Sequence, residues 1–434
     1  MWTFAYELQG SAVLATTVTD PRGNPATYRF NAQGFTLSQT DALGQTTVFD
    51  YEPGSNLLRS TTDPLGRVTS FTYDTQGNVT TITDPAGNTR TFTYEGTFNR
   101  VTSIRDPLGN TTQFAYDATG NLTTITDPLG ARTAIAFNSF GQPTSTTDPL
   151  LNTTAFSYDS SGNLTTITDP LGNTTRRTYD PASRLIAQTD PRAQGTAFAY
   201  DALNRLTHIT DSLAGSTRFT YDGNGNLLSV TDALGNSITH IYDPMDRLAT
   251  RTDPVSASES FAYDGVGNLT RHTDRKGQVA TFAYDPLNRR MGATYADSAT
   301  SFTYDSVGRL IQATDSAGGT ILTAYDALDR LVAQSTGLGT ISYQYDALAR
   351  RTCRSRYRNA EFTHSFAHGE PGRLVGTGYC GEHFTTGYLV VSYPCHDLGR
   401  RGFALVLEQG SLILPVVGRR SLLRLLREEA PSRQ

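Results

Sequence analysis

Short apolar and β-branched runs alternate with polar turns along most of the chain. In one representative unit, residues 111–116 and 122–126 are rich in Thr, aromatic residues and Ile, and turn-forming segments at 117–121 and 127–130 separate them. Phe114 and Tyr116 are two positions apart and therefore share one face of a strand. Because β-branched and aromatic residues favour strands, each unit predicts a β-hairpin, and nothing in the array predicts a helix.

An aromatic residue, usually followed by an acid, recurs every 20 to 22 residues, and in twelve of sixteen copies the following residue is Asp. A fixed short period indicates one supersecondary unit stacked on its neighbours, because a unit this small cannot bury a core alone. The aromatic positions are Phe30, Tyr51, Tyr73, Tyr94, Tyr116, Phe137, Tyr158, Tyr179, Tyr200, Tyr221, Tyr242, Tyr263, Tyr284, Tyr304, Tyr325 and Tyr345.

Each period carries two turn signals. The first is Asp-Pro-Leu-Gly, in which Asp accepts backbone hydrogen bonds, Pro presets φ and Gly adopts φ > 0; it begins at Asp63, Asp106, Asp127 and Asp169. The second follows the aromatic-acid pair and requires a left-handed residue four positions after the aromatic. That position holds Gly34, Gly77, Gly120, Gly141, Gly162, Gly225, Gly267, Gly308, Asn204, Asp246, Asn288 or Asp329.

We therefore assign structural roles to the repeated Tyr, Asp and Gly. The repeat-defining residues are Tyr73, Asp74, Gly77, Tyr116, Asp117, Gly120, Tyr158, Asp159, Gly162, Tyr221, Asp222, Gly225, Tyr263, Asp264 and Gly267. Leu122 and Ile125 are three apart, which breaks strict alternation. This spacing indicates either a β-bulge or a sheet lightly loaded on both faces.

Composition and charge agree with a thin β structure. The apolar fraction is 37%, below that of ordinary globular domains. The chain carries a net charge of −5, which divides into −10 for residues 1–350 and +5 for residues 351–434. An acidic repeat body argues against nucleic acid as its ligand, because phosphate contacts require clustered cations.

The phrase Phe-x-Tyr-Asp-x-x-Gly-Asn-Leu, combined with Thr-Asp-Pro-Leu-Gly-Asn, resembles the YD repeat of bacterial RHS (rearrangement hotspot) proteins, which the teneurin family shares. The resemblance covers residues 1–350, about sixteen repeats. It implies an all-β fold in which tandem hairpins wind into a spiral, shell-like sheet. In bacterial members that shell resembles a cocoon that holds a C-terminal toxin and is delivered to competitors or hosts.

Sixteen hairpins at roughly 4.8 Å per strand give a ribbon on the order of 150 Å long. Such a ribbon curls into a ring about 50 Å across, which is one turn or so of wall and too little to seal a cavity.

The repeated acids could be read as catalytic pairs. An acid at the same turn of every repeat is instead a structural acceptor for backbone N–H groups, so no enzyme activity is expected. Asp222 to Asn226 resembles the start of a calcium loop. However, Leu227 stands where an EF-hand requires Gly, and Asp232 comes one position early. No cofactor or metal is therefore assigned to the array.

Three functions remain open. The first is a non-enzymatic shell fragment that encapsulates a toxin cargo, contacts neighbouring shell segments or interacts with a cell surface. The second is a carbohydrate- or receptor-binding module, since exposed tyrosines can stack on sugars; packing between hairpins explains their placement better. The third is a polymorphic toxin whose activity lies in residues 351–434.

The residues after Arg350 differ from the repeats, because the period stops there and Arg, Cys and His become frequent. Our preferred hypothesis is a reading-frame change in a truncated gene, with a remnant toxin region second; residues 351–418 are expected to lack a stable fold of their own. Cys380-x-x-His383 with His364 and His368 has a loose zinc-like spacing, and residues 419–429 form an amphipathic pattern. The boundary segment that carries self-cleavage in RHS proteins does not occur.

The sequence from Met1 to Tyr6 has no basic or apolar region typical of a signal peptide, and no apolar run is long enough to span a membrane. The localisation is therefore open, and secretion or cell-surface exposure by a non-classical route is expected. Asn-x-Thr triplets are glycosylation acceptors only in a eukaryotic secretory pathway. In a bacterial chain they are turns that enter Thr-rich strands.

Overall fold

The computed structural model describes residues 1–358, 360–369 and 373–378, with side chains through residue 352. These residues form one antiparallel sheet of 36 strands. The first half comprises β1 Thr3–Gln9, β2 Ala12–Thr19, β3 Pro25–Phe30, β4 Thr36–Thr40, β5 Thr46–Tyr51, β6 Leu58–Thr62, β7 Val68–Tyr73, β8 Val79–Thr83, β9 Thr89–Tyr94, β10 Val101–Arg105, β11 Thr111–Tyr116, β12 Leu122–Thr126, β13 Arg132–Phe137, β14 Pro143–Thr147, β15 Thr153–Tyr158, β16 Leu164–Thr168, β17 Thr174–Tyr179 and β18 Leu185–Thr189. The second half comprises β19 Gly195–Tyr200, β20 Leu206–Thr210, β21 Ser216–Tyr221, β22 Leu227–Thr231, β23 Ser237–Tyr242, β24 Leu248–Thr252, β25 Ser258–Tyr263, β26 Leu269–Thr273, β27 Val279–Tyr284, β28 Arg290–Thr294, β29 Ala299–Tyr304, β30 Leu310–Asp315, β31 Gly319–Tyr325, β32 Leu331–Thr336, β33 Gly339–Tyr345, β34 Arg351–Arg358, β35 Ala360–Gly369 and β36 Arg373–Gly378.

Each strand from β2 to β35 pairs with the strand before it and the strand after it along the chain, so the sheet is a continuous meander of hairpins. No helix occurs among the described residues, and none of them therefore belongs to a helix capable of crossing a membrane. The all-β hairpin array predicted from the repeats is confirmed.

The meander places its turns in two rows. The turns that precede odd-numbered strands form what we call the Asp-Pro edge, and those that follow odd-numbered strands form the Tyr-Asp edge. The Asp-Pro edge comprises turns beginning at Asp20, Asp41, Asp63, Asp84, Asp106, Asp127, Asp148, Asp169, Asp190, Asp211, Asp232, Asp253 and Asp274. The Tyr-Asp edge comprises turns beginning at Asn31, Glu52, Asp74, Glu95, Asp117, Asn138, Asp159, Asp180, Asp201, Asp222, Asp243, Asp264, Asp285, Asp305, Asp326 and Asp346.

A β-bulge explains the three-residue spacing between Leu122 and Ile125. In the β11–β12 hairpin Ala115 pairs with Thr124 and Tyr116 pairs with Leu122, so Thr123 is the extra residue. Its hydroxyl donates to the backbone oxygen of Ala115 at 3.1 Å. The bulge brings Leu122 and Ile125 onto the face that carries Phe114 and Tyr116. Of the two interpretations of this spacing, the bulge is the correct one.

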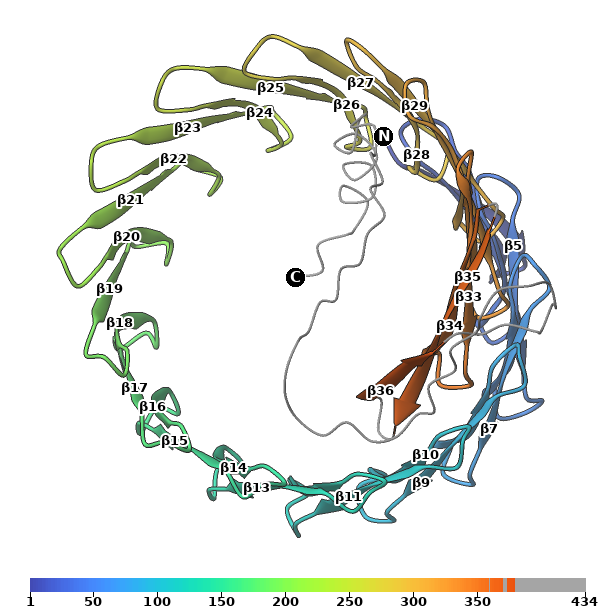
Figure 1. Cartoon of the computed structure of the whole chain (residues 1–434), viewed down its shortest axis with the longest axis horizontal. Coiled ribbons are helices and arrows are strands. Elements are labelled where there is room, and N and C mark those ends of the chain that lie inside the picture. Colours follow the sequence, from blue (N-terminus) through green and yellow to red (C-terminus); the bar gives the residue numbers. More distant parts are fainter. Residues whose placement is uncertain (359, 370–372, 379–434) are drawn as a thin grey trace.

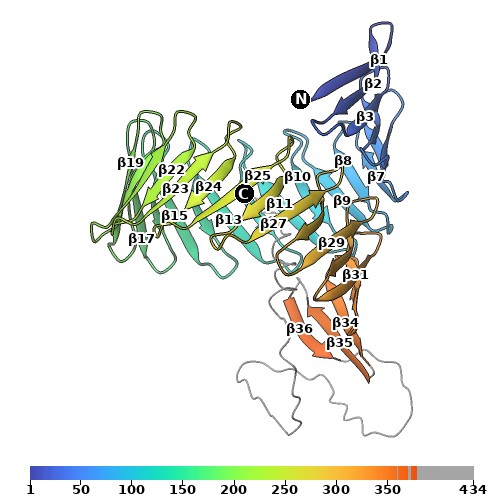
Figure 2. The same ribbon diagram turned by 90° about the horizontal axis from the view of Figure 1, so that it is seen from above.

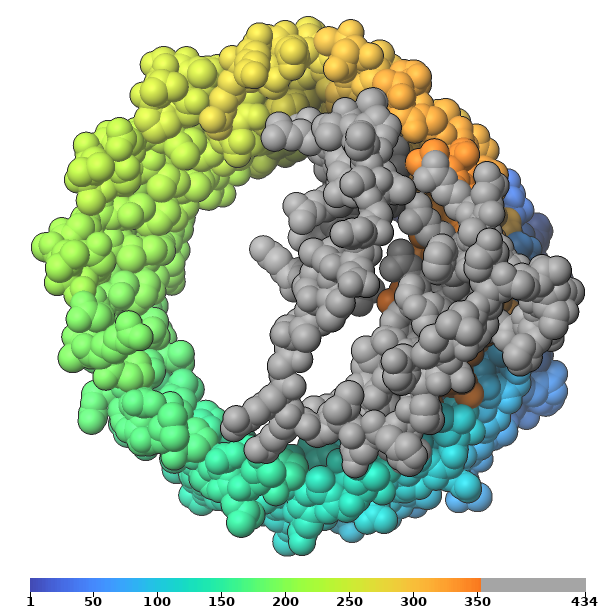
Figure 3. All heavy atoms as spheres, viewed as in Figure 1, coloured from blue at the N-terminus to red at the C-terminus, as the bar shows by residue number. Residues whose placement is uncertain are grey.

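The ribbon curls into a ring and continues past one full circuit (Figure 1). Seen from the side, the first strands, β1 to β3, and the last strands, β34 to β36, lie at opposite ends of a spiral, and the intervening strands form its wall (Figure 2). The expectation of about one turn of wall agrees with this shape. The described wall surrounds a hollow centre (Figure 3).

The wall is a single layer, and few of its side chains are buried. The buried hydrophobic residues are Ala15, Ala280, Ala293, Phe302, Ala313 and Ile321, and no described side chain is fully enclosed. The low apolar content therefore corresponds to a thin wall, in which neighbouring hairpins cover one another only in part.

Three strands extend the sheet past the boundary expected at residue 350. β34 pairs with β33, and β35 and β36 follow in the same antiparallel order. They add to the array and form no separate fold among the described residues. The division at residue 350 between array and tail stays a prediction. The suggested helix at 419–429 and the residues Cys380 and His383 lie outside the described part of the chain.

Candidate functional site

The Tyr-Asp turn is the unit from which the wall is built. At Asp117, the backbone N–H groups of Thr119 and Asn121 each donate to Oδ1 at 2.9 Å, and the Asn121 amide donates to Oδ2 at 2.9 Å. A further hydrogen bond from the Thr119 hydroxyl is the largest influence on this carboxyl, and with those from Asn121 it holds the pKa of Asp117 well below its usual range. The ionised carboxylate of Asp117 therefore stabilises the turn by accepting these hydrogen bonds.

The same arrangement occurs at the other repeat-defining acids. Asp74, Asp159, Asp222 and Asp264 each accept the N–H groups two and four residues later. The following glycines have positive φ, as do all twelve positions predicted to be left-handed: Gly34, Gly77, Gly120, Gly141, Gly162, Gly225, Gly267, Gly308, Asn204, Asp246, Asn288 and Asp329. The prediction of left-handed φ at these twelve positions is confirmed.

The repeated tyrosine ties each hairpin to the preceding one. The Tyr116 hydroxyl donates to the backbone oxygen of Val101, fifteen residues earlier, at 2.8 Å. Equivalent bonds join Tyr73 to Leu58, Tyr158 to Pro143, Tyr221 to Leu206 and Tyr263 to Leu248. Because the hydroxyl is used within the wall, the tyrosine is a structural cross-link between repeats.

Arginines on the Tyr-Asp edge add a second cross-link, which our sequence analysis missed. Arg184 donates from Nε to Asp180 Oδ2 at 2.7 Å and from Nη1 to the next turn, at Asp201 O (3.3 Å) and Asn204 Oδ1 (2.9 Å). Its guanidinium carbon lies 5.0 Å from the centre of the Tyr200 ring. Similar arginines are Arg205, Arg247, Arg289, Arg309 and Arg330. Each of these arginines follows the repeated tyrosine by five residues. This constant spacing is the sequence signal from which the second cross-link could have been predicted.

Successive coils of the spiral meet along a seam, where the Asp-Pro edge of the first coil lies against the Tyr-Asp edge of the second. Arg22 Nη2 donates to Asp285 O and Asn288 Oδ1, both at 2.6 Å. Its Nε also lies 3.8 Å from Asp264 Oδ2. Arg22 therefore contacts two consecutive Tyr-Asp turns, and one circuit of the spiral takes about twelve repeats.

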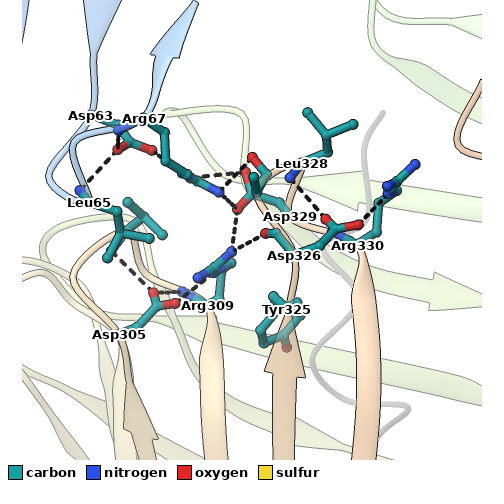
Figure 4. A network of polar contacts seen from close by, with 12 residues as sticks. Asp63, Leu65, Arg67, Asp305, Arg309, Tyr325, Asp326, Leu328, Asp329 and Arg330 are labelled. Carbon is teal, nitrogen blue, oxygen red and sulfur yellow. Dashed lines mark hydrogen bonds and ion pairs between the residues drawn. The ribbon is translucent and has the colours of Figure 1, made fainter. Parts of the chain in front are cut away.

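A second contact closes the seam two repeats further along (Figure 4). Arg67 Nη1 donates to Ala327 O at 3.1 Å and to Asp329 Oδ1 at 2.7 Å. Arg309, from the second coil, donates to the same Asp329 oxygen at 2.8 Å. The hydrogen bond to Asp329 raises the pKa of Arg67. The seam arginines thus use the same acceptors, a turn carbonyl and the side chain of the left-handed residue, that Arg184 uses within one coil.

Comparison with known families agrees with this geometry. A model of the teneurin YD-shell matches residues 178–352, and a model of the RHS repeat matches residues 53–89, 97–132, 137–174 and 158–197. Together they account for more than half of the chain. The chain belongs to the RHS/YD-repeat family. No curated protein sequence matches it significantly.

Solved structures show the same fold for this RHS chain. The crystal structure of TcdB2-TccC3-TEV matches with a TM-score of 0.72 and 15% identity, covering 86% of this chain and 24% of that one. TcdB2-TccC3 without its hypervariable C-terminal region matches at 0.70 and 16%, covering 86% and 25%. A Tc holotoxin pore from Photorhabdus luminescens matches at 0.66 and 16%, covering 85% and 24%. The chain therefore spans about a quarter of the length of these solved chains.

A charged cluster lies on the face of this RHS wall that carries Phe114 and Ile125 in the β11–β12 hairpin. Arg251 and His272 occupy the strand position that Ile125 holds in β12, and both contact Glu259. The distances to Glu259 are 2.5 Å from Arg251 Nη2, 3.1 Å from His272 Nε2 and 3.5 Å from Arg275 Nη2. Burial opposes ionisation of Glu259, but the hydrogen bonds from His272 and Arg251 lower its pKa overall.

The calcium-like segment is an ordinary Tyr-Asp turn of the repeat. Asp222 accepts backbone N–H groups from Asn224 and Asn226 and the Asn226 side-chain amide. These bonds occupy the oxygens that a calcium ion would need. Within the described residues no group of three or more His, Cys, Asp and Glu residues is arranged to hold a metal ion.

Proposed function

We propose that this chain is a non-enzymatic wall segment of an RHS shell and that the shell encloses a polypeptide cargo. The contact between successive coils at the seam is the observation that supports this proposal. Arg22 and Arg67 join coils whose residues lie 260 or more positions apart in the chain, so the hairpin ribbon closes into a ring and is not an extended solenoid. A ring with a hollow centre supports a role as one segment of a container wall.

The two faces of the sheet support a cargo on the inside. In β11, Phe114 and Tyr116 are half-buried, whereas Gln113 and Ala115, on the opposite face, are exposed. Side chains crowd together on the concave side of a curled sheet and spread apart on the convex side. We infer from this crowding that the face carrying Phe114 and Tyr116 is the inner one, and a largely apolar lining would suit a polypeptide that is not fully folded.

The chemistry of the repeats supports a structural role over catalysis. The turn carboxylates are occupied by N–H donors, and the tyrosine hydroxyls by backbone oxygens. Arginines lie over several tyrosine rings, among them Tyr200 and Tyr221. A tyrosine whose ring is covered by an arginine and whose hydroxyl donates to a backbone oxygen offers a poor stacking surface to a sugar. This weakens the alternative of carbohydrate binding.

A reporter protein fused to the chain tests the proposal. A small folded reporter protein is fused through a flexible linker after Gln434 of the full chain, and electron cryo-microscopy locates its density. We expect the reporter inside the ring, with slower proteolysis than in the matched variant Arg22→Ala/Arg67→Ala, whose seam is weakened. Reporter density outside the ring, together with equal cleavage rates in both proteins, would refute encapsulation. Glycan-array binding by a chain whose reporter lies outside would favour the surface-binding alternative.

A further inference from the structure

Most of both turn edges lies outside the seam. On the Asp-Pro edge the seam involves the first turns, where Leu43 and Leu65 are 42% and 44% exposed. Further along the same edge Leu108 and Leu129 are 48% and 60% exposed, and the apolar side chains at this position from residue 150 onward are 82–89% exposed. The latter are Leu150, Leu171, Leu213, Leu234 and Val255. We call this row the free Asp-Pro edge.

The Tyr-Asp edge shows the same contrast. At the seam the third turn residues Val266, Leu287, Val307 and Leu328 are half-buried. Away from the seam, Phe140, Leu203 and Met245 at the same turn position are 86%, 67% and 60% exposed. On this edge Ser161, Ala182 and Asn224 stand between these apolar residues, whereas on the free Asp-Pro edge only Arg192 interrupts the row. Clustered exposed apolar side chains are characteristic of an interaction surface. Each edge therefore carries the apolar groups that the other edge covers at the seam.

The free Asp-Pro edge also repeats the polar part of the seam. The sequence Asp-Pro-Arg occurs twice, at Asp20 to Arg22 and at Asp190 to Arg192. Arg22 is bound to Asp285 and Asn288 of the next coil. Arg192 holds the same turn position, is exposed, and forms no ion pair with another described residue. A seam-type arginine is thus presented beside the exposed leucines.

We propose that the free Asp-Pro edge binds the free Tyr-Asp edge of a second copy of this chain. The contact repeats the seam: each Asp-Pro turn of one copy enters the notch between two Tyr-Asp turns of the other, and Arg192 donates to a turn carbonyl there. The interface continues an edge contact that the chain already makes with itself. Because different surfaces of the two copies meet, the contact is head-to-tail and can propagate into a tube.

This assembly concerns the outer edges of the ring and does not depend on a cargo. A second ring stacked on the first would cover the exposed turn rows with repeats of the same sequence.

Sedimentation velocity of the full chain over a concentration series tests the proposal. We expect reversible dimers and larger species that weaken as salt concentration rises. The variant Leu171→Glu/Leu213→Glu/Leu234→Glu should weaken association at least about tenfold, because charge enters the apolar contact. The matched control is Ile241→Glu, a 61% exposed side chain on a strand and outside both rows of turn residues, and it should associate like the parent. Circular dichroism checks that each variant is folded.

A chain that stays monomeric at all concentrations would overturn the proposal, as would association that the edge variant leaves unchanged. Hydroxyl-radical footprinting shows whether a second copy of the chain covers the free Asp-Pro edge. We expect Leu213 and Leu234 on one edge and Phe140 and Met245 on the other to become protected together as concentration rises. Protection that is complete at every concentration would show that another segment of the same chain covers the edge and would refute a second copy. Arg192→Ala should reduce the salt dependence of association.

Discussion

At the residue scale, each turn depends on one carboxylate, one left-handed position and one tyrosine hydroxyl. These groups act within five residues of one another or on the adjacent hairpin, so their roles follow from local chemistry. Left-handed φ is imposed even where the residue is unsuited to it. Leu151, for example, has φ 67° in a turn that otherwise has the Asp-Pro-Leu-Gly form.

Replacing Leu151 by Gly should stabilise its hairpin by about 1 kcal/mol. The side chain is 82% exposed, so little burial is lost. Relief of left-handed strain outweighs the entropy cost of an added glycine. The matched reverse change is Gly172→Leu in the next Asp-Pro turn, where φ is 83° and an added Cβ meets no atom. It should destabilise by a similar amount. Native-state hydrogen exchange in β14–β17 measures both, and shifts of the same sign would contradict the strain argument.

At the element scale, the hairpins were predictable because their determinants repeat at fixed positions. A single repeat of 20 to 22 residues is enough to predict the strands, the two turn types and the left-handed positions. The lateral arginines were missed because Arg184 and Asn163 alternate at the same turn position, and only the structure shows that the arginine reaches the next turn. The charged cluster was also missed, because Arg251 and His272 replace apolar residues without any change in the strand pattern.

The charged cluster gives a prediction for β24–β26. Glu259 is 8% exposed and is the common partner of Arg251, His272 and Arg275. Glu259→Gln removes the countercharge and should cost about 1–2 kcal/mol, which is below the value for a fully buried pair because the arginines are partly in water. The control Glu7→Gln removes the Arg29 pair, in which both side chains are more than half exposed. It should cost less than about 0.5 kcal/mol.

Local opening of β24–β26 by hydrogen exchange, compared with β1–β3, measures the two effects. Equal effects of the two substitutions would show that the cluster contributes no more than a surface pair.

At the scale of the whole molecule, the spiral could not be located from the sequence beyond an approximate count of turns. Asp-Pro-Arg and Asp-Pro-Leu turns look equivalent locally, and whether Arg22 meets Asp285 depends on small rotations summed over about twelve repeats. The seam is therefore a property of accumulated twist. The ionised turn carboxylates are also a property of the whole array, because nearly every repeat contains them, and they make the wall sensitive to acid.

The carboxyls of Asp117, Asp159 and Asp222 have lowered pKa values, chiefly through side-chain hydrogen bonds from Thr119, Asn163 and Asn226 respectively. In the unfolded chain an Asp titrates near about 3.9. The unfolded state therefore binds protons more readily, so the ionised form contributes stability above about pH 4, and this contribution is lost as the pH falls further. We expect the urea midpoint of the array to be steady from about pH 7 to 5 and to drop steeply below about pH 4.

One repeat supplies an internal control for this acid effect. Asn138 occupies the turn position of Asp117, and its uncharged Oδ1 accepts the N–H groups of Phe140 and Gln142 at 2.9 and 3.0 Å. Below pH 4, amides of β13–β14 should keep more protection than those of β11–β12, once intrinsic exchange rates are corrected. The variant Asp117→Asn should transfer this resistance to β11–β12, since the amide oxygen makes the same backbone bonds without titrating. Equal loss of protection in both hairpins, unchanged by Asp117→Asn, would mean that carboxylate protonation in the turns does not drive acid unfolding.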